Sequence, residues 1–475
     1  MMLRNVRPWG YRLVVLAMLV AVSDWSRAAQ GDSADRACEP QPFRFEDDCR
    51  GLASQSVDLH GLDRLKYLPL TEDGSIWLTV GGEYRARVES LDQPNFGVSP
   101  VDKAFVAWGQ RFLAEADLRT TAGWRVFVQL SASTDTGRKP AERPFDRSDP
   151  DLAQGFVEIP LPIPGAPATL RIGRQELDLG GTRLVSPSEV ANLRRAFDMV
   201  HVDTRIKDLD IVGFWGRPVV NQRSAFDDTA PPSESFYGLV LHAQPRLADH
   251  PVTVDMLLLG RERDKAVYVD AVGPEHRRLV GLRAAGDFGP IDYSAAVSYE
   301  FGRIARSDIS AYGVSLTGGY RFSGLRWTPR LGVDFGLSSG DRQRKDGTLN
   351  TFDPLYPNLG YFTDAPVDFP ANWIGLEPNL TIEPWSRLSI KMGADIHFRD
   401  TTTDAIYGSN ALPFVPGGAP GGNFADVLGF VHATWRATPR LQIEAGYVHG
   451  WVGRPITAVG GRDLNYELLK GSYRF

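Results

Sequence analysis

The sequence predicts an all-β fold: a transmembrane antiparallel β-barrel of about eighteen strands with short periplasmic turns and long extracellular loops. Apolar and polar residues alternate with period two along most of the chain, and tight connections mostly take turns with long ones. Beyond the N-terminus, no apolar run is long enough for a membrane-spanning helix. Of the 475 residues, 43% are apolar and 23% charged, which excludes a disordered chain. The net charge of −6 disfavours a nucleic-acid-binding protein.

The first 28 residues have the layout of a cleaved secretory signal peptide. Arginines precede an apolar run at residues 13–22, and Ser26 and Ala28 occupy the −3 and −1 positions of a cleavage site. The run is too short to be a membrane anchor, which is the rival interpretation. We therefore expect cleavage after Ala28, a periplasmic segment at residues 29–75 and an outer-membrane barrel at residues 76–475.

Two cysteines, Cys38 and Cys49, closely follow the predicted cleavage site. Exported proteins enter an oxidising compartment, so these two thiols can pair as a disulfide. The loop between them is short and close to the terminus, which favours a stiffening role. No histidine lies between the two cysteines, so we expect no metal site there.

The strand pattern begins at Ile76. In residues 76–89, Ile76 and Leu78 fall on the apolar face, whereas Arg85 and Arg87 fall on the polar face. Prolines interrupt the fourth and fifth segments, and these two are the weakest. The predicted strands start near residues 76, 105, 124, 154, 168, 197, 209, 235, 252, 277, 290, 310, 326, 372, 387, 425, 440 and 463.

The connections differ in length by position. Short turns at one rim and long loops at the other are typical of outer-membrane barrels, whose two rims face different compartments. A secreted solenoid or propeller is the soluble alternative, but the chain has no fixed internal period. Tight connections are predicted at residues 121–123, 207–208, 288–289, 323–325, 385–386 and 438–439. Long ones are predicted at residues 92–104, 137–151, 177–195, 218–234, 264–275, 339–371, 399–423 and 453–462.

Aromatic residues support the same fold. The chain ends with Tyr473 and Phe475 on either side of Arg474, a pattern found at the end of many bacterial barrels. Tryptophans recur near strand ends, where amphipathic rings form a lipid-interface girdle. These tryptophans are Trp77, Trp108, Trp124, Trp215, Trp327, Trp373, Trp435 and Trp451.

A barrel of this size is expected to enclose a polar, water-filled lumen. Arginine is frequent among the residues of inward parity, and its rigid fork matches carboxylate and phosphate oxygens. One interpretation is a cationic lining for an acidic solute, and the other is a wall stiffened by Arg–Glu pairs. The candidate lining residues are Arg85, Arg87, Arg111, Arg125, Arg174, Arg183, Arg194 and Arg195, and the supporting acids are Glu83, Glu115 and Asp117.

Two of these assignments depend on local geometry. The loop at residues 177–195 carries Arg183, Arg194 and Arg195, and it would constrict the pore if it folded inward. Strict alternation from Ile172 points Arg174 toward lipid, so a pore-lining Arg174 requires a bulge.

The sequence contains no motif for catalysis or for a resident cofactor. We find no GxSxG, HExxH, Walker A or CxxC pattern, so no enzyme activity, cofactor or metal is predicted. Asp146, Asp149 and Asp151 form an acidic loop but lack the spacing of a calcium-binding loop. We interpret this loop as solvated.

Three stretches resemble the alginate export family of outer-membrane proteins, and the likeness runs from about residue 60 to Phe475. The family implies a monomeric eighteen-stranded barrel that passes an anionic exopolysaccharide through an arginine-rich pore. Met199 departs from the glycine expected after the Phe-Asp pair. The stretches are residues 65–70 with 77–89, residues 173–177 with 181–185, and residues 192–198.

The resemblance and the lumen residues together predict a porin-like channel in the bacterial outer membrane. It would conduct an alginate-like polysaccharide or another anionic solute by passive, electrostatically assisted diffusion. The alternatives are an uptake porin for small organic anions or sugars, and a plugged outer-membrane enzyme or adhesin. Expected partners are outer-membrane lipid, the anionic solute and periplasmic export components. No nucleic acid is expected among them.

Overall fold

The computed structural model describes residues 38, 41–54, 61–98, 103–139, 145–358, 360, 363–367, 369–409 and 411–475. The predicted signal peptide at residues 1–28 lies outside this range, so its cleavage stays a prediction. No helix in the described part of the chain is long and apolar enough to cross a membrane.

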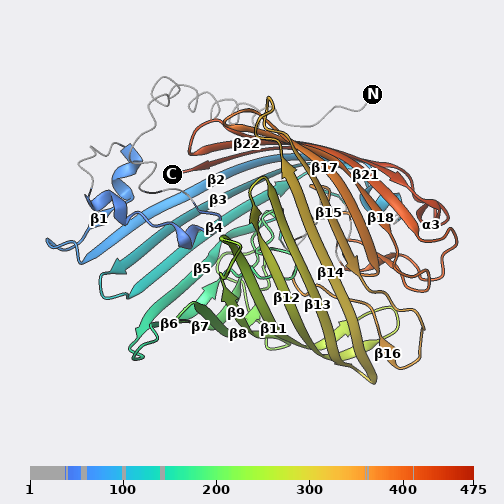
Figure 1. Cartoon of the computed structure of the whole chain (residues 1–475), viewed down its shortest axis with the longest axis horizontal. Helices are drawn as coiled ribbons and strands as arrows, with labels where there is room; N and C mark the ends of the chain where they lie inside the picture. Colours follow the sequence, from blue (N-terminus) through green and yellow to red (C-terminus); the bar gives the residue numbers. More distant parts are fainter. Residues whose placement is uncertain are drawn as a thin grey trace.

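The described chain forms one closed barrel of 18 antiparallel strands, which confirms the predicted fold (Figure 1). Each strand hydrogen-bonds to its neighbours in the chain, and β23 pairs with β2 to close the sheet. The wall strands are β2 (Ile76–Leu91), β3 (Phe105–Thr120), β4 (Arg125–Thr136), β5 (Ser148–Leu161), β6 (Ala168–Gln175), β7 (Phe197–Ile206), β8 (Leu209–Pro218), β9 (Glu234–Ala243), β11 (His250–Val267), β12 (Val272–Phe288), β13 (Ile291–Ile304), β14 (Ser307–Arg321), β15 (Arg330–Ser338), β17 (Trp373–Trp385), β18 (Leu388–Phe398), β21 (Phe424–Arg436), β22 (Leu441–Val452) and β23 (Leu464–Arg474).

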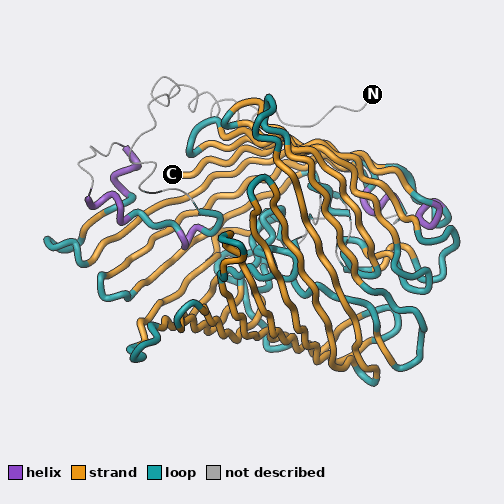
Figure 2. The backbone as a smooth tube through the Cα atoms, in the orientation of Figure 1, coloured by secondary structure: helices purple, strands orange, loops and turns teal. Residues whose placement is uncertain are grey.

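Short elements lie in the connections and before the wall. They are the 3-10 helices η1 (Arg44–Glu46), η2 (Arg50–Ser54), η3 (Gly61–Leu65) and η4 (Pro94–Gly97), the helix α3 (Arg454–Thr457), and the strands β1 (Leu68–Pro69), β10 (Arg246–Leu247), β16 (Thr348–Leu349), β19 (Ile406–Tyr407) and β20 (Pro413–Val415). Figure 2 shows that strands make up most of the molecule, with loops gathered at the rims and inside.

The two faces of the wall follow the predicted alternation. On β4, Val126 and Val128 point outward and are exposed, while Phe127 and Gln129 point inward and are buried. An outward apolar band is what lipid requires, because hydrocarbon cannot solvate polar side chains. The fourth strand starts earlier than predicted, at Ser148 instead of near residue 154. The pairing of β4 with β5 shifts register near Leu130 and again near Ser133, which disrupts the alternation in the part of β5 that the prediction missed.

One predicted loop is wrong. Residues 264–275 were expected to form a long connection, but β11 runs to Val267 and β12 starts at Val272. The charged residues at the ends of these strands resemble a polar loop in sequence. In the structure Arg261, Arg263 and Glu275 point into the barrel and pair with one another.

Part of the predicted tryptophan girdle is also wrong. Trp124, Trp215 and Trp451 are exposed on the outer wall, as expected for a lipid interface. Trp77 and Trp373 are buried instead, because they occupy inward positions of β2 and β17. Trp77 stacks on Tyr67 from the segment before the barrel.

The lumen is less polar and less open than the sequence suggested. Long loops fold inward and bury apolar side chains against the inner wall in two clusters. The first joins Phe96, Val367 and Val415 to the inner faces of β21–β23. The second joins Leu177, Val185 and Tyr356 from two loops to inward residues of β7–β14 such as Phe197, Phe214 and Phe236. Met199, the departure from the family pattern, belongs to the second cluster and is 4% exposed.

Candidate functional site

The segment between β6 and β7, residues 176–196, turns back into the lumen. We call it the constriction loop. Its fold is compact: Leu179 and Val185 exchange two backbone hydrogen bonds, and Arg195 N–H donates to the carbonyl of Pro187 at 2.8 Å. Thr182 and Ser188 adopt positive φ angles, 68° and 59°, which allow the tight reversals. The condition stated for this loop, that it folds inward, is therefore met, and a pore-constricting role for its arginines stays a prediction.

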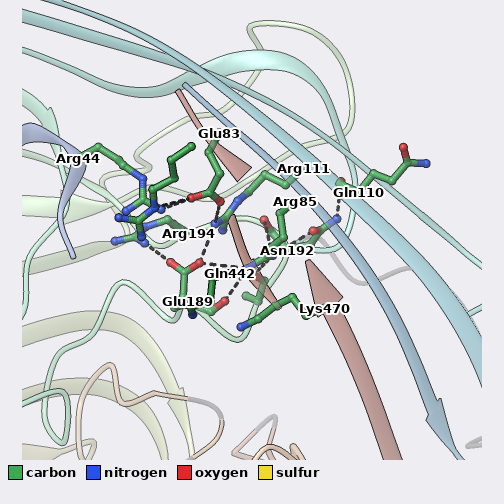
Figure 3. A network of polar contacts seen from close by, with 12 residues as sticks. Arg44, Glu83, Arg85, Gln110, Arg111, Glu189, Asn192, Arg194, Gln442 and Lys470 are labelled. Carbon is green, nitrogen blue, oxygen red and sulfur yellow. Dashed lines mark hydrogen bonds and ion pairs between the residues drawn. The ribbon is translucent and has the colours of Figure 1, made fainter. Parts of the chain in front are cut away.

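Glu189 lies where the constriction loop meets the inner wall (Figure 3). Arg111 Nη2 is 2.6 Å from Glu189 Oε1 and 2.5 Å from Glu83 Oε1. Arg85 and Arg194 also pair with Glu189. The side chains of Arg85 and Arg111 are 1% exposed, whereas the Glu189 side chain is 44% exposed. The loop carboxylate thus gathers three guanidinium groups while keeping contact with the lumen.

Arginines of the wall also bind the backbone of the constriction loop. Arg85 donates to the carbonyl oxygens of Glu189 at 2.8 Å and Ala191 at 2.7 Å, and Arg87 donates to that of Val190. Carbonyl oxygens satisfy the N–H groups but carry no full negative charge. Arg85 also lies 3.2 Å from Glu189 Oε1, and Arg87 lies 3.5 Å from Glu89 Oε1.

Asn192 fixes the base of the same loop. Its Nδ2 donates to the carbonyl oxygens of Asp146 at 2.8 Å and of Gln110 and Thr134 at 3.1 Å each. These contacts join the constriction loop to β3, β4 and the loop before β5. Sequence reasoning missed Asn192, because a single amide in a loop gives no pattern.

Arg194 and Arg195 stabilise the loop itself. Arg194 forms a two-pronged pair with Glu176, with both N–O distances at 2.7 Å. Burial acts to lower the pKa of Arg194, but the carboxylates of Glu176 and Glu189 outweigh it and hold the pKa above its usual value. Arg195 donates to the carbonyl of Tyr356 at 2.6 Å, and burial lowers its pKa to about 10. Both residues remain cationic at neutral pH.

The structure separates three of the predicted lining residues from this cluster. Arg125 lies lower on the wall and pairs with Asp117, with Nε–Oδ1 at 2.8 Å. Arg174 lies at the long-loop end of β6, where Gly173 has φ of 134°, and it binds Asp198 and the carbonyl of Leu152. Arg183 lies at the bend of the constriction loop beside a small cavity next to Arg283.

Of the predicted supporting acids, only Glu83 lies in the cluster around Glu189. Glu83 bridges Arg111 and Arg44. Glu115 lies one step below and accepts a hydrogen bond from Gln129 at 2.7 Å. Glu189, Glu176 and Arg44 were not among the predicted site residues. For Glu189 and Glu176, the one clue in the sequence is that each is an acidic residue in or next to the loop that carries the arginines.

Strands β18, β22 and β23, on the other side of β2 from β3, carry further inner-wall charges that were not among the predicted site residues. Lys470 Nζ is 2.7 Å from Glu444, which also accepts from Gln442 at 2.7 Å. Lys391 pairs with Glu377 at 2.6 Å, and its side chain is 36% exposed. Lys391 is thus a cation of the inner wall that remains open to solvent.

One group of carboxylates in the described residues is close enough for a metal ion: Asp151, Asp227 and Asp228. The backbone N–H groups of Asp227 and Asp228 already donate to Asp151 Oδ2, and Arg174 lies 3.9 Å from Asp151 Oδ1. The predicted acidic loop therefore does not act as a unit. Its other member Asp146 pairs with Arg138 at 3.1 Å.

Comparison with known proteins gives one family and one group of solved folds. Residues 76–469 match the family model described as alginate export. The outer membrane protein OpdK of Pseudomonas aeruginosa superposes with a TM-score of 0.56 at 11% identity, over 84% of this chain and 98% of that one. OccK2 (OpdF) of the same organism, solved with glucuronate, gives 0.53 at 13% identity over 86% and 98%. OpdK solved with vanillate gives 0.56 at 12% identity over 84% and 98%. At such identities these structures show the fold alone, and no curated protein matches the chain.

Proposed function

Because the chain belongs to the alginate export family, we propose that it passes an anionic polysaccharide, or another anionic solute, across the bacterial outer membrane. Passage is passive and is assisted by the positive potential of the constriction. The protein is a β-barrel channel of the outer membrane, and its family and structural neighbours are channels rather than enzymes. Outer-membrane lipid surrounds the wall, and we propose that the barrel acts as a monomer.

One observation carries this proposal: a cluster of guanidinium groups holds the constriction loop inside the lumen. Arg85 and Arg87 donate mainly to carbonyl oxygens, while Arg111 and Arg194 share the half-exposed Glu189. In a narrow, low-dielectric passage, such a concentration of guanidinium groups attracts anions. Uronate polymers carry regularly spaced carboxylates that fit this potential.

Uptake of small organic anions is the second candidate. The structures of the neighbouring channels with vanillate and with glucuronate concern small carboxylates. In this chain the two apolar clusters and the inward loops narrow the lumen, which suits a small solute better than a bulky one. Both candidates use the same cationic constriction and differ in the size of what passes it.

Ion selectivity in planar bilayers tests the proposal. The wild-type channel is expected to prefer anions, and the variant Arg85→Ser/Arg87→Ser/Arg111→Ser should lose most of this preference. Lys391→Gln should reduce it without touching the constriction loop. Arg205→Ser, at an exposed rim pair, is the matched control. An unchanged reversal potential in both lumen variants would contradict the cationic constriction.

Blocking experiments separate the two candidates. A polymer channel should be blocked more strongly and for longer by uronate oligomers as their length increases, because more carboxylates engage the wall at once. A small-solute porin should respond best to the monomer. Block by neutral oligosaccharides of equal length serves as the control.

A further inference from the structure

The segment before the first wall strand enters the barrel. Arg44 is 4% exposed and Phe45 8%, although both belong to the part of the chain expected to lie in the periplasm. Their partners are inward-facing residues near the short-turn rim, and this rim faces the periplasm in barrels of this kind. Figure 3 places Arg44 beside Glu83 of β2. We propose that residues 41–49, the plug segment, form a resident plug that narrows the periplasmic mouth of the channel.

The inner wall carries an aromatic seat for this segment. Phe127 of β4 and Phe156 of β5 point inward and stack at 5.2 Å, and they are 1% and 3% exposed. Phe45 packs edge-on against Phe156 at 5.9 Å. Two phenylalanines on the lumen side would face water if the segment left. These two phenylalanines can occupy inward positions because Phe45 covers them and excludes water.

Cationic side chains complete the seat. The guanidinium of Arg171 lies 4.9 Å from the ring centre of Phe45, and that of Arg125 lies 5.4 Å from the ring centre of Phe127. Such contacts between a cation and an aromatic face are favourable and strengthen when water is excluded. The seat thus combines apolar contact with fixed charge.

Polar contacts from four wall strands hold the backbone of the plug segment. Arg125 of β4 donates to the carbonyl of Phe45, and Arg119 of β3 donates to that of Asp47 at 2.8 Å. Arg474 of β23 donates to the carbonyl of Gln41 at 3.0 Å. On β2, Glu83 forms a buried ion pair with Arg44. These four strands are consecutive in the wall, so the segment has a defined position along one side of the mouth, which it narrows from that side.

A disulfide joins Cys38 to Cys49 and so encloses the plug segment in a closed loop. Leu52 and Tyr67 pack against the bond. A cross-link of this kind reduces the conformations available to a detached segment, which lowers the entropic cost of seating it. The disulfide therefore favours the seated state.

The plug segment is also connected to the constriction loop. Glu83 pairs with Arg44 on one side and with Arg111 on the other, and Arg111 pairs with Glu189. In addition, the guanidinium of Arg194 lies 5.9 Å from the ring centre of Phe43. Displacing the plug segment thus removes Arg44 from its pair with Glu83. Because Glu83 also binds Arg111, we expect a change at the plug segment to affect the constriction loop as well.

Single-channel recording of the full chain tests the plug. The variant Arg44→Ala/Phe45→Ala should raise the open conductance by about twofold or more and admit larger neutral polymers, because the periplasmic mouth widens. Arg50→Ala is the matched control, since Arg50 lies outside the plug segment, is 62% exposed and pairs with Asp48. Heat-modifiable migration in gels establishes that each variant forms the barrel.

A second measurement needs no variant. Reducing the disulfide of the wild-type protein should increase the frequency of high-conductance openings, and removal of the reductant should reverse this. If the double variant and the reduced protein both keep the conductance and polymer cutoff of the oxidised wild-type protein, the plug is overturned. This outcome is distinct from failure of the proposed function, which rests on ion preference rather than on conductance.

Discussion

At the scale of single residues, the arginines illustrate what side-chain type and position can tell. Their parity along β2 and β3 placed Arg85, Arg87 and Arg111 in the lumen, and the structure has them there. Parity does not identify partners, and the partners decide the role. The structure shows these guanidinium groups bound to a loop that lies far away in the sequence.

Asp341 is a residue whose protonation should matter. It lies in the loop between β15 and β17 and is 3% exposed. Burial, and then the nearby carboxylates of Asp404 and Asp270, raise its pKa to about 6. A raised carboxyl pKa means that the packed loop favours the protonated form. The resulting penalty is absent below the usual pKa and complete above pH of about 6.

We therefore expect the amide protection factors of the loop at residues 339–372, which correct for the intrinsic pH dependence of exchange, to be higher at pH 5 than at pH 7.5. Asp341→Asn should raise these protection factors at pH 7.5 and remove most of their pH dependence. Asp346→Asn, at an exposed position of the same loop, is the control and should have a much smaller effect, because Asp346 contributes less to the raised pKa of Asp341 than burial, Asp404 and Asp270 do. Equal pH dependence in the wild type and Asp341→Asn would assign the effect to another group.

At the scale of elements, strands were far easier to predict than loops. A strand between lipid and lumen must alternate, so its sequence carries its own signature. A loop that folds into the lumen obeys no periodicity, because each of its residues meets a different neighbour. The constriction loop was recognised as a candidate only through its arginines, and Glu189, which organises them, was missed.

Glu189→Ala is expected to loosen the constriction loop. The change removes the shared partner of Arg85, Arg111 and Arg194, and a lost charge-assisted hydrogen bond costs about 2 kcal/mol. Water replaces part of this contribution, since the Glu189 side chain is 44% exposed. We predict noisier and larger single-channel currents. Glu189→Gln keeps the side-chain shape, so its currents should be intermediate between those of the wild type and those of Glu189→Ala. Wild-type currents in Glu189→Ala would show that the loop is held by its backbone contacts alone.

At the scale of the whole molecule, closure depends on the seam between the first and last strands. Gly82 and Phe475 exchange two backbone hydrogen bonds, both at 3.0 Å. A Cβ atom on Gly82 would lie 2.5 Å from the carbonyl oxygen of Leu113 and 2.5 Å from the Phe475 ring. The backbone approach at this point therefore requires glycine.

Gly82→Val should obstruct closure and lower the fraction of assembled barrel, measured by heat-modifiable migration after refolding into detergent. Gly471→Val is the matched control, because Gly471 lies on the same seam and no atom is within 4 Å of its Cβ position. Equal assembly of both variants would mean that the seam tolerates a side chain at Gly82.

The sequence alone determined the barrel, its approximate number of strands and the face that most strands turn to lipid. These properties follow from a constraint that acts on every residue locally: hydrocarbon on one side and water or protein on the other. Pairs such as Arg85 with Glu189 and Phe45 with Phe156 were decided only by the tertiary structure. They join residues far apart in the chain, and what brings them together is the closed wall, which fixes where each loop and the plug segment meet.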